Sequence, residues 1–220
     1  MSNNTSPQIQ PLPTTTYKFL PNDLGYNLVV ILFSAFTILN SITLIVNFYI
    51  FYLLNKNSQT PSNEMLNDFV NTGNLYNKLA FWLLILFIIC AFAFLFWLYR
   101  ANNNAHALHP EKKFEFTPAW SVGSYFIPIL FLYWPYKALK EIWFTTIANN
   151  SSLLQIWWLT FLMMTFARKY LNTLSVHAIS DMQTYNLIST IHSLSAIIST
   201  SAAILIIIKI QQSQKQATTK

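Results

Sequence analysis

Residues 79–99 read LAFWLLILFIICAFAFLFWLY, a run of 21 residues without a single charge. A helix needs about 20 predominantly apolar residues to cross the hydrocarbon core of a bilayer. This run is apolar on every side and is closed by Arg100, so we expect a helix that faces lipid over much of its surface. The whole composition agrees, because only 9% of the residues are charged, against about 25% in soluble proteins.

The chain divides into three parts by composition. We expect a disordered polar tail over residues 1–26, a membrane domain over 27–209 and a polar tail over 210–220. Apolar blocks within the domain predict four spanning helices, at about residues 27–54, 79–99, 153–174 and 186–208. The predicted fold class is therefore all-α, a polytopic bundle of membrane helices.

Polar and small side chains lie on one face of the first and last predicted spans. Asn40 and Asn47 fall close together on a helical wheel, and small residues recur from Ser189 at small-xxx-small spacing. Such faces let helices approach closely and exchange hydrogen bonds. We interpret both as packing faces, and we expect the same of His192 in the last span. The alternative is a small-solute channel or transporter component.

Residues 119–135 form a shorter apolar stretch. Its first 16 residues contain Gly123 and Pro128, and Pro135 follows them directly. A proline inside a helix removes a hydrogen bond and kinks the helix, and Trp and Tyr favour the depth of the lipid headgroups. We expect a re-entrant or interfacial segment here. The alternative is a fifth, kinked span.

The distribution of basic residues favours four spans. Cytoplasmic loops of membrane proteins carry an excess of Lys and Arg. Four spans with both termini in the cytoplasm place nine basic residues inside and four outside, whereas five spans divide them six and seven. The basic residues are scattered and flank apolar blocks, which does not fit nucleic-acid binding.

The middle of the chain resembles a known family. Residues 97–101 read WLYRA and residues 116–129 read FTPAWSVGSYFIPI. Asn104, Pro135-Tyr136, Glu141-Ile142-Trp143 and the paired Trp157 and Trp158 complete the pattern. Together these resemble the bacterial membrane family catalogued as domain of unknown function 4328, over about residues 80–208. The resemblance implies a helical membrane architecture in a bacterial inner membrane, and it implies no activity.

Three positions depart from the family pattern. Ser124 stands in place of an aromatic residue, Phe131 in place of Asn, and Leu139 in place of a frequent Met. The missing Asn argues against any mechanism that needs a polar group at that depth.

The residues that carry the resemblance are the candidate interaction residues. They are Trp97, Tyr99, Arg100, Asn104, Trp120, Gly123, Tyr125, Pro128, Pro135, Tyr136, Glu141, Trp143, Trp157 and Trp158. The many Trp, Tyr and Pro residues between Trp120 and Trp143, with basic residues on both flanks, predict a docking surface at the cytoplasmic interface. Expected partners are the lipid bilayer and another membrane protein or a second copy. Arg100 and Glu141 form either an ion pair or two separate interfacial anchors.

Signs of catalysis are weak. His106 and His109 are three residues apart and are weak metal candidates, with Glu111 and Glu115 nearby. A metal site needs further ligands and a supporting shell, so we expect no metal and no cofactor. The sequence contains no phosphate-binding loop, nucleophile motif or zinc-protease motif. We therefore expect an interaction or scaffold module, with a membrane enzyme or metal-binding protein as a further alternative.

Overall fold

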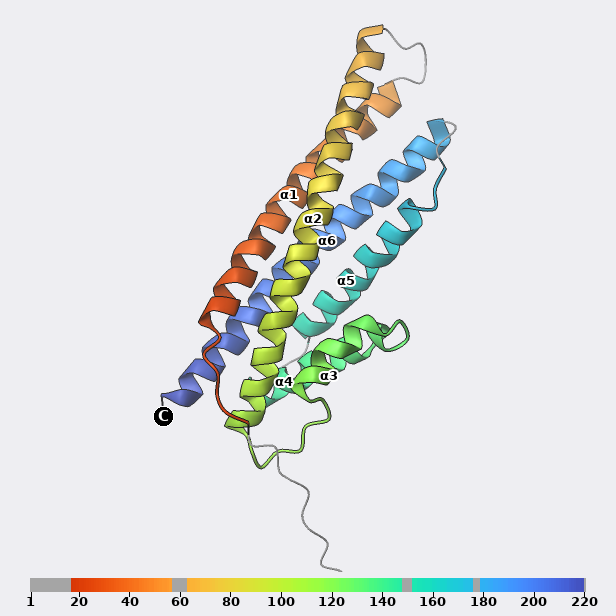
Figure 1. Cartoon of the computed structure of the whole chain (residues 1–220). Helices are drawn as coiled ribbons and strands as arrows, with labels where there is room; N and C mark the ends of the chain where they lie inside the picture. Colours follow the sequence, from red (N-terminus) through yellow and green to blue (C-terminus); the bar gives the residue numbers. More distant parts are fainter. Residues whose placement is uncertain (1–16, 57–62, 148–151, 176–178, 220) are drawn as a thin grey trace, which may run out of the picture.

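The computed structural model describes residues 17–56, 63–147, 152–175 and 179–219 (Figure 1). These residues form helices and no strand, which confirms the all-α prediction. The helical segments are α1 (Asp23–Lys56), α2 (Asn63–Leu108), α3 (Pro118–Gly123), η1 (Ser124–Phe126), η2 (Leu130–Leu132), α4 (Trp134–Thr146), α5 (Ser152–Leu171) and α6 (Ile179–Thr218). Residues 1–16 of the expected N-terminal tail lie outside the described part.

The four long helices alternate in direction along the chain (Figure 1). Helix α6 packs against both α1 and α5, and α2 packs against α1. Helices α3 and α4 lie at the end of the bundle where α2 ends and α5 begins (Figure 1). The segment from α3 to α4, which we call the hairpin, therefore leaves and returns at one end of the bundle.

Three of the described helices are long and apolar enough to cross a membrane. Their spans are Asp23–Lys56, Val70–Leu108 and Ser180–Thr218, which confirms the apolar helices expected around residues 27–54, 79–99 and 186–208. Helix α5, which corresponds to the fourth expected span, has 20 residues and carries Arg168 and Lys169 in its last turn. It is not one of the three.

The helices extend well past the apolar blocks that predict them. Helix α2 has 46 residues, about 69 Å of helix, because Tyr76 on one side of the apolar block and Ala101 and Ala105 on the other are buried against neighbours. Residues 17–22 lie ordered along α2, and α6 continues to Thr218. Part of the disordered tail expected over 1–26 is therefore ordered, and residues 210–218 of the polar tail expected over 210–220 continue the last helix.

The polar face of α1 packs on α6, as interpreted from the sequence. The Thr37 and Thr200 hydroxyl oxygens lie 2.7 Å apart. Asn186 Nδ2 donates to the Asn47 carbonyl oxygen at 3.0 Å, and Ser189 donates to Asn47 Oδ1 at 3.2 Å. Asn47 thus bonds to α6 inside the bundle, as a packing residue does, whereas Asn40 donates to the Phe36 carbonyl of its own helix and is fully buried. Neither arrangement supports a conduit lined by Asn40 and Asn47.

The main core lies at the hairpin end of the bundle. Trp97 and Leu98 of α2, Ile142 of α4, Leu154 of α5 and Ile206 of α6 are fully buried and belong to one cluster. With Val29 of α1, this cluster joins α4 to all four long helices, so it fixes where the hairpin begins and ends.

Candidate functional site

The family-like residues at the end of α2 hold an N-terminal strap, residues 17–22, against that helix. Asn104 is buried; its Oδ1 accepts from the Leu20 N–H at 2.8 Å and its Nδ2 donates to the Leu20 carbonyl at 2.9 Å. The Arg100 guanidinium donates to the Pro21 carbonyl at 2.6 Å. Asn104 and Arg100 therefore hold the strap in place through hydrogen bonds to its backbone.

His106 also belongs to this arrangement. Its ring lies between Tyr17 and Phe114, with centroid distances of 4.3 and 4.1 Å, and its Nε2 lies 3.0 Å from the Phe116 carbonyl oxygen. His109 Nδ1 lies 3.6 Å from a Glu111 carboxylate oxygen. No group of three His, Cys, Asp or Glu side chains suited to a metal occurs within the described residues.

Glu141 fastens the loop between α2 and α3. Its two carboxylate oxygens accept from the backbone N–H groups of Glu115, at 2.6 Å, and Phe116, at 3.1 Å. The side chain of Glu115 pairs with Lys137, and this hydrogen bond raises the pKa of Lys137. Arg100 and Glu141 thus have different partners, and the ion pair considered between them is not formed.

The hairpin is built from short helical turns that proline and capping favour. Thr117 caps α3, because its side chain accepts a hydrogen bond from the Trp120 N–H. Pro118 occupies the first turn of α3, where a backbone N–H would have no partner within the helix. At the tip, Trp158 Nε1 of α5 donates to the Leu132 carbonyl at 3.2 Å, and its ring packs on Phe131. These contacts hold the hairpin tip against α5.

The candidate interaction residues do not share one exposed surface. Six of them are buried: Trp97, Asn104, Pro135, Trp143, Trp157 and Trp158. Five are partly buried: Arg100, Gly123, Tyr125, Tyr136 and Glu141. Only Tyr99, Trp120 and Pro128 are exposed. Trp143 is 2% exposed and packs in the main core. It therefore cannot belong to the docking surface expected between Trp120 and Trp143.

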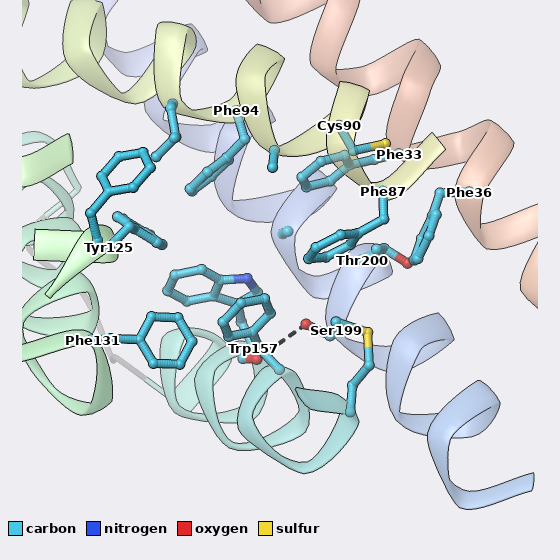
Figure 2. Close-up of a pocket in the computed structure, with 16 residues that line it drawn as sticks. Phe33, Phe36, Phe87, Cys90, Phe94, Tyr125, Phe131, Trp157, Ser199 and Thr200 are labelled. Carbon is cyan, nitrogen blue, oxygen red and sulfur yellow. Dashed lines mark hydrogen bonds between the residues drawn. The ribbon is translucent and has the colours of Figure 1, made fainter. Parts of the chain in front are cut away.

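A cavity of about 250 Å³ lies where the hairpin, α2 and α5 meet, and we call it the aromatic cavity (Figure 2). It is partly open to the outside of the bundle. Nine of its lining residues are aromatic: Phe33 and Phe36 of α1, Phe87 and Phe94 of α2, Tyr125, Phe126 and Phe131 of the hairpin, and Trp157 and Phe161 of α5. The other lining residues are Cys90, Ala91 and Leu95 of α2, Met164 of α5, and Ser199, Thr200 and Ala203 of α6.

A ligand in the aromatic cavity would contact the faces of aromatic rings and very few polar atoms. In Figure 2 the rings of Phe94 and Trp157 approach each other across the gap between α2 and α5, with centroids 6.2 Å apart. The Ser199 hydroxyl already donates to the Trp157 carbonyl at 3.3 Å. The hydroxyl of Tyr125 is buried without a hydrogen-bond partner in the described structure. Such a site suits a chain or ring of hydrocarbon with at most one polar group.

A second cavity of about 190 Å³ adjoins the first on the side away from the hairpin. The two share Phe36, Phe87 and Met164 in their linings. Arg168 and His192 are the ionisable side chains of the second lining besides Tyr76, so we call it the polar cavity. The gap between α2 and α5 thus gains ionisable and hydroxyl groups on the side away from the hairpin, within a lining that is otherwise apolar.

Sequence reasoning found Tyr125 and Trp157 but missed most of this site. On α5 the signal was present, because Trp157, Phe161 and Met164 recur at i, i+4 and i+7 and so share a helix face. The rings from α1 and the hairpin carry no comparable signal. Their contribution depends on how five segments meet.

The comparisons with known proteins identify a family and nothing beyond it. Neither the search of the curated proteins nor that of the solved structures found a match. The profile described as "Domain of unknown function (DUF4328)" matches residues 71–215, about two thirds of the chain. The match covers the apolar part of α2, the hairpin, α5 and most of α6, and with them most of the lining of both cavities. The chain therefore belongs to the DUF4328 family.

Proposed function

We propose that this chain is a multi-pass protein of the cytoplasmic membrane, and that it works as an interaction module which binds a lipid between α2 and α5. In this proposal α1, α2, α5 and α6 all cross the bilayer, and the hairpin is re-entrant. The alternation of the long helices supports four crossings, because an even number brings both termini to one side. Asp23 at the start of α1 and Lys215 near the end of α6 form an ion pair, 2.7 Å apart.

The charges support a cytoplasmic location for the hairpin end. Among the described residues, the segments at that end carry eight basic residues: Lys18, Arg100, Lys112, Lys113, Lys137, Lys140, Lys209 and Lys215. The described segments toward the other end carry four: Lys56, Lys78, Arg168 and Lys169. Lys and Arg are enriched on the cytoplasmic side of membrane proteins. Exposed apolar side chains on the hairpin, among them Phe126, Ile129 and Tyr133, suit insertion into the cytoplasmic leaflet.

The aromatic cavity is the observation that carries the lipid-binding proposal. Its volume of about 250 Å³ is lined almost entirely by apolar atoms. In a bilayer, a cavity partly open between two helices is within reach of lipid chains. An apolar cavity of about 150 Å³ already holds a benzene molecule, so this one has room for a segment of an acyl chain. The proposal is one of binding rather than catalysis.

Filling the aromatic cavity is expected to remove the bound lipid. Ala91 of α2 lines the cavity and Ala35 of α1 is exposed outside it, so Ala91→Trp places a large ring in the site while Ala35→Trp makes the same change on a lipid-facing surface. We expect the protein purified in mild detergent to retain lipid by native mass spectrometry. Ala91→Trp is expected to bring this retention to background, whereas Ala35→Trp leaves it unchanged.

Thermal unfolding of both variants controls for misfolding, and Ala91→Phe is a milder replacement at the same place. Equal lipid retention by the wild type and a folded Ala91→Trp protein would rule out the aromatic cavity as the site.

A further inference from the structure

The polar cavity contains side chains that suit an anion, within a lining that is otherwise apolar. Its lining contains Arg168 of α5, and His192 and Ser193 of α6. No Asp or Glu is among its lining residues, and Arg168 forms no salt bridge with a carboxylate of the described residues. A guanidinium at the edge of a membrane favours phosphate, which accepts two parallel hydrogen bonds from its planar fork.

Ser193 supplies an independent indication of a ligand. Its side chain is 1% exposed, and its hydroxyl is buried without a hydrogen-bond partner in the described structure. Buried hydroxyls are nearly always paired, and neighbouring polar groups are occupied. The Tyr76 hydroxyl lies 2.8 Å from that of Ser189, and Thr43 donates to the Leu39 carbonyl. The Ser193 hydroxyl is thus an unpaired donor in the lining of the polar cavity, available to a ligand.

The position of the polar cavity fits the headgroup of a lipid whose chain enters the aromatic cavity. The two cavities adjoin at Phe36, Phe87 and Met164. Arg168 lies in the last turn of α5, where a long basic side chain reaches headgroup depth. In the proposed topology this end faces the outer leaflet.

We infer that Arg168 and Ser193 bind the phosphate of an anionic phospholipid, with one acyl chain of that lipid lying in the aromatic cavity. The occupant is a lipid of net negative charge because no carboxylate lines the cavity to pair with the ammonium group of a zwitterionic headgroup. This inference rests on the proposed function and adds the class of lipid to it.

The test compares phosphatidylglycerol with phosphatidylcholine of identical acyl chains. Each is added to the delipidated protein, and retained lipid is measured by native mass spectrometry. We expect phosphatidylglycerol to be preferred by about tenfold, because both lipids carry the same phosphodiester but only phosphatidylcholine brings a second positive charge close to the Arg168 guanidinium. Arg168→Gln is expected to abolish the preference while the protein still retains lipid. Ser193→Ala is expected to lower the retention of both lipids while keeping the preference, because it removes a hydrogen bond to the shared phosphate without changing the charge of the site.

Lys169→Gln is the matched control, because it removes an exposed positive charge one residue away. It should leave the preference intact. The inference is overturned if a folded Arg168→Gln protein keeps the preference, or if Lys169→Gln loses it equally. Equal retention of both lipids by the wild type would also overturn it while leaving the proposed function in place. If neither lipid is retained, the proposed function itself fails.

Discussion

Replacing Trp158 with alanine is expected to release the hairpin tip from α5 and to destabilise the fold by about 3 kcal/mol or more, the usual cost of truncating a buried Trp. Trp158 is buried, donates to the Leu132 carbonyl and packs on Phe131 and Phe161. The truncation removes both the hydrogen bond and the ring contacts. Because Phe131 and Phe161 also line the aromatic cavity, lipid retention should fall together with stability.

Trp158→Phe separates these contributions. It keeps an aromatic ring against Phe131 but removes the N–H donor and part of the indole, so we expect a loss of about 1–2 kcal/mol, smaller than that of Trp158→Ala. Thermal unfolding and limited proteolysis of the hairpin measure both variants. A Trp158→Ala protein as stable and as protease-resistant as the Trp158→Phe protein would show that the tip is not held by this ring.

Asn104→Leu is expected to detach the N-terminal strap and to cost about 2 kcal/mol, because it removes two hydrogen bonds to the Leu20 backbone. Leucine has the branched shape and the number of side-chain heavy atoms of asparagine, with bulkier methyl ends, so it keeps the site filled and the loss reports chiefly on the hydrogen bonds. In the Asn104→Leu protein, the backbone N–H and carbonyl of the half-exposed Leu20 can form hydrogen bonds with water. The loss of stability is therefore smaller than it would be for two fully buried groups.

Asn103→Ala is the control for the strap. Its Nδ2 makes one exposed hydrogen bond, to the Lys18 carbonyl at 2.7 Å, and its loss should change stability by less than about 0.5 kcal/mol. Proteolysis at Lys18 reports on strap release directly. Unchanged cleavage at Lys18 in the Asn104→Leu protein would contradict the structural role given to Asn104.

The sequence predicts the apolar helices well, because a 21-residue run such as 79–99 has few folded alternatives. It also predicts that Asn47 and Ser189 serve helix packing, since small and polar residues on a spanning helix favour another helix over lipid. The ends of the helices are harder to predict. Helix α6 continues past its apolar block because Ile210 and Gln214 are buried, and Gln214 donates to the Ala101 carbonyl at 2.8 Å.

The roles of the middle residues could not be predicted, because they depend on distant partners. His106 and Glu141 look like chemical groups in the sequence, yet one is enclosed by Tyr17 and Phe114 and the other accepts from the backbone of the loop before α3. The aromatic cavity is hidden for the same reason. Its rings come from segments as far apart in the sequence as Phe33 and Phe161, and no local sequence pattern indicates that these segments lie close together.

The sidedness of α5 tests the account most directly, because a lipid held from Arg168 toward the hairpin requires this helix to cross. Single cysteines are introduced by Lys113→Cys, Asn172→Cys and Gln216→Cys in a Cys90→Ala background; all three positions are exposed. Intact cells are treated with a membrane-impermeant thiol reagent before and after permeabilisation. We predict that Asn172→Cys reacts in intact cells and that the other two react only after permeabilisation. Labelling of the Lys113→Cys and Asn172→Cys proteins from the same side would contradict a crossing α5 beside a re-entrant hairpin.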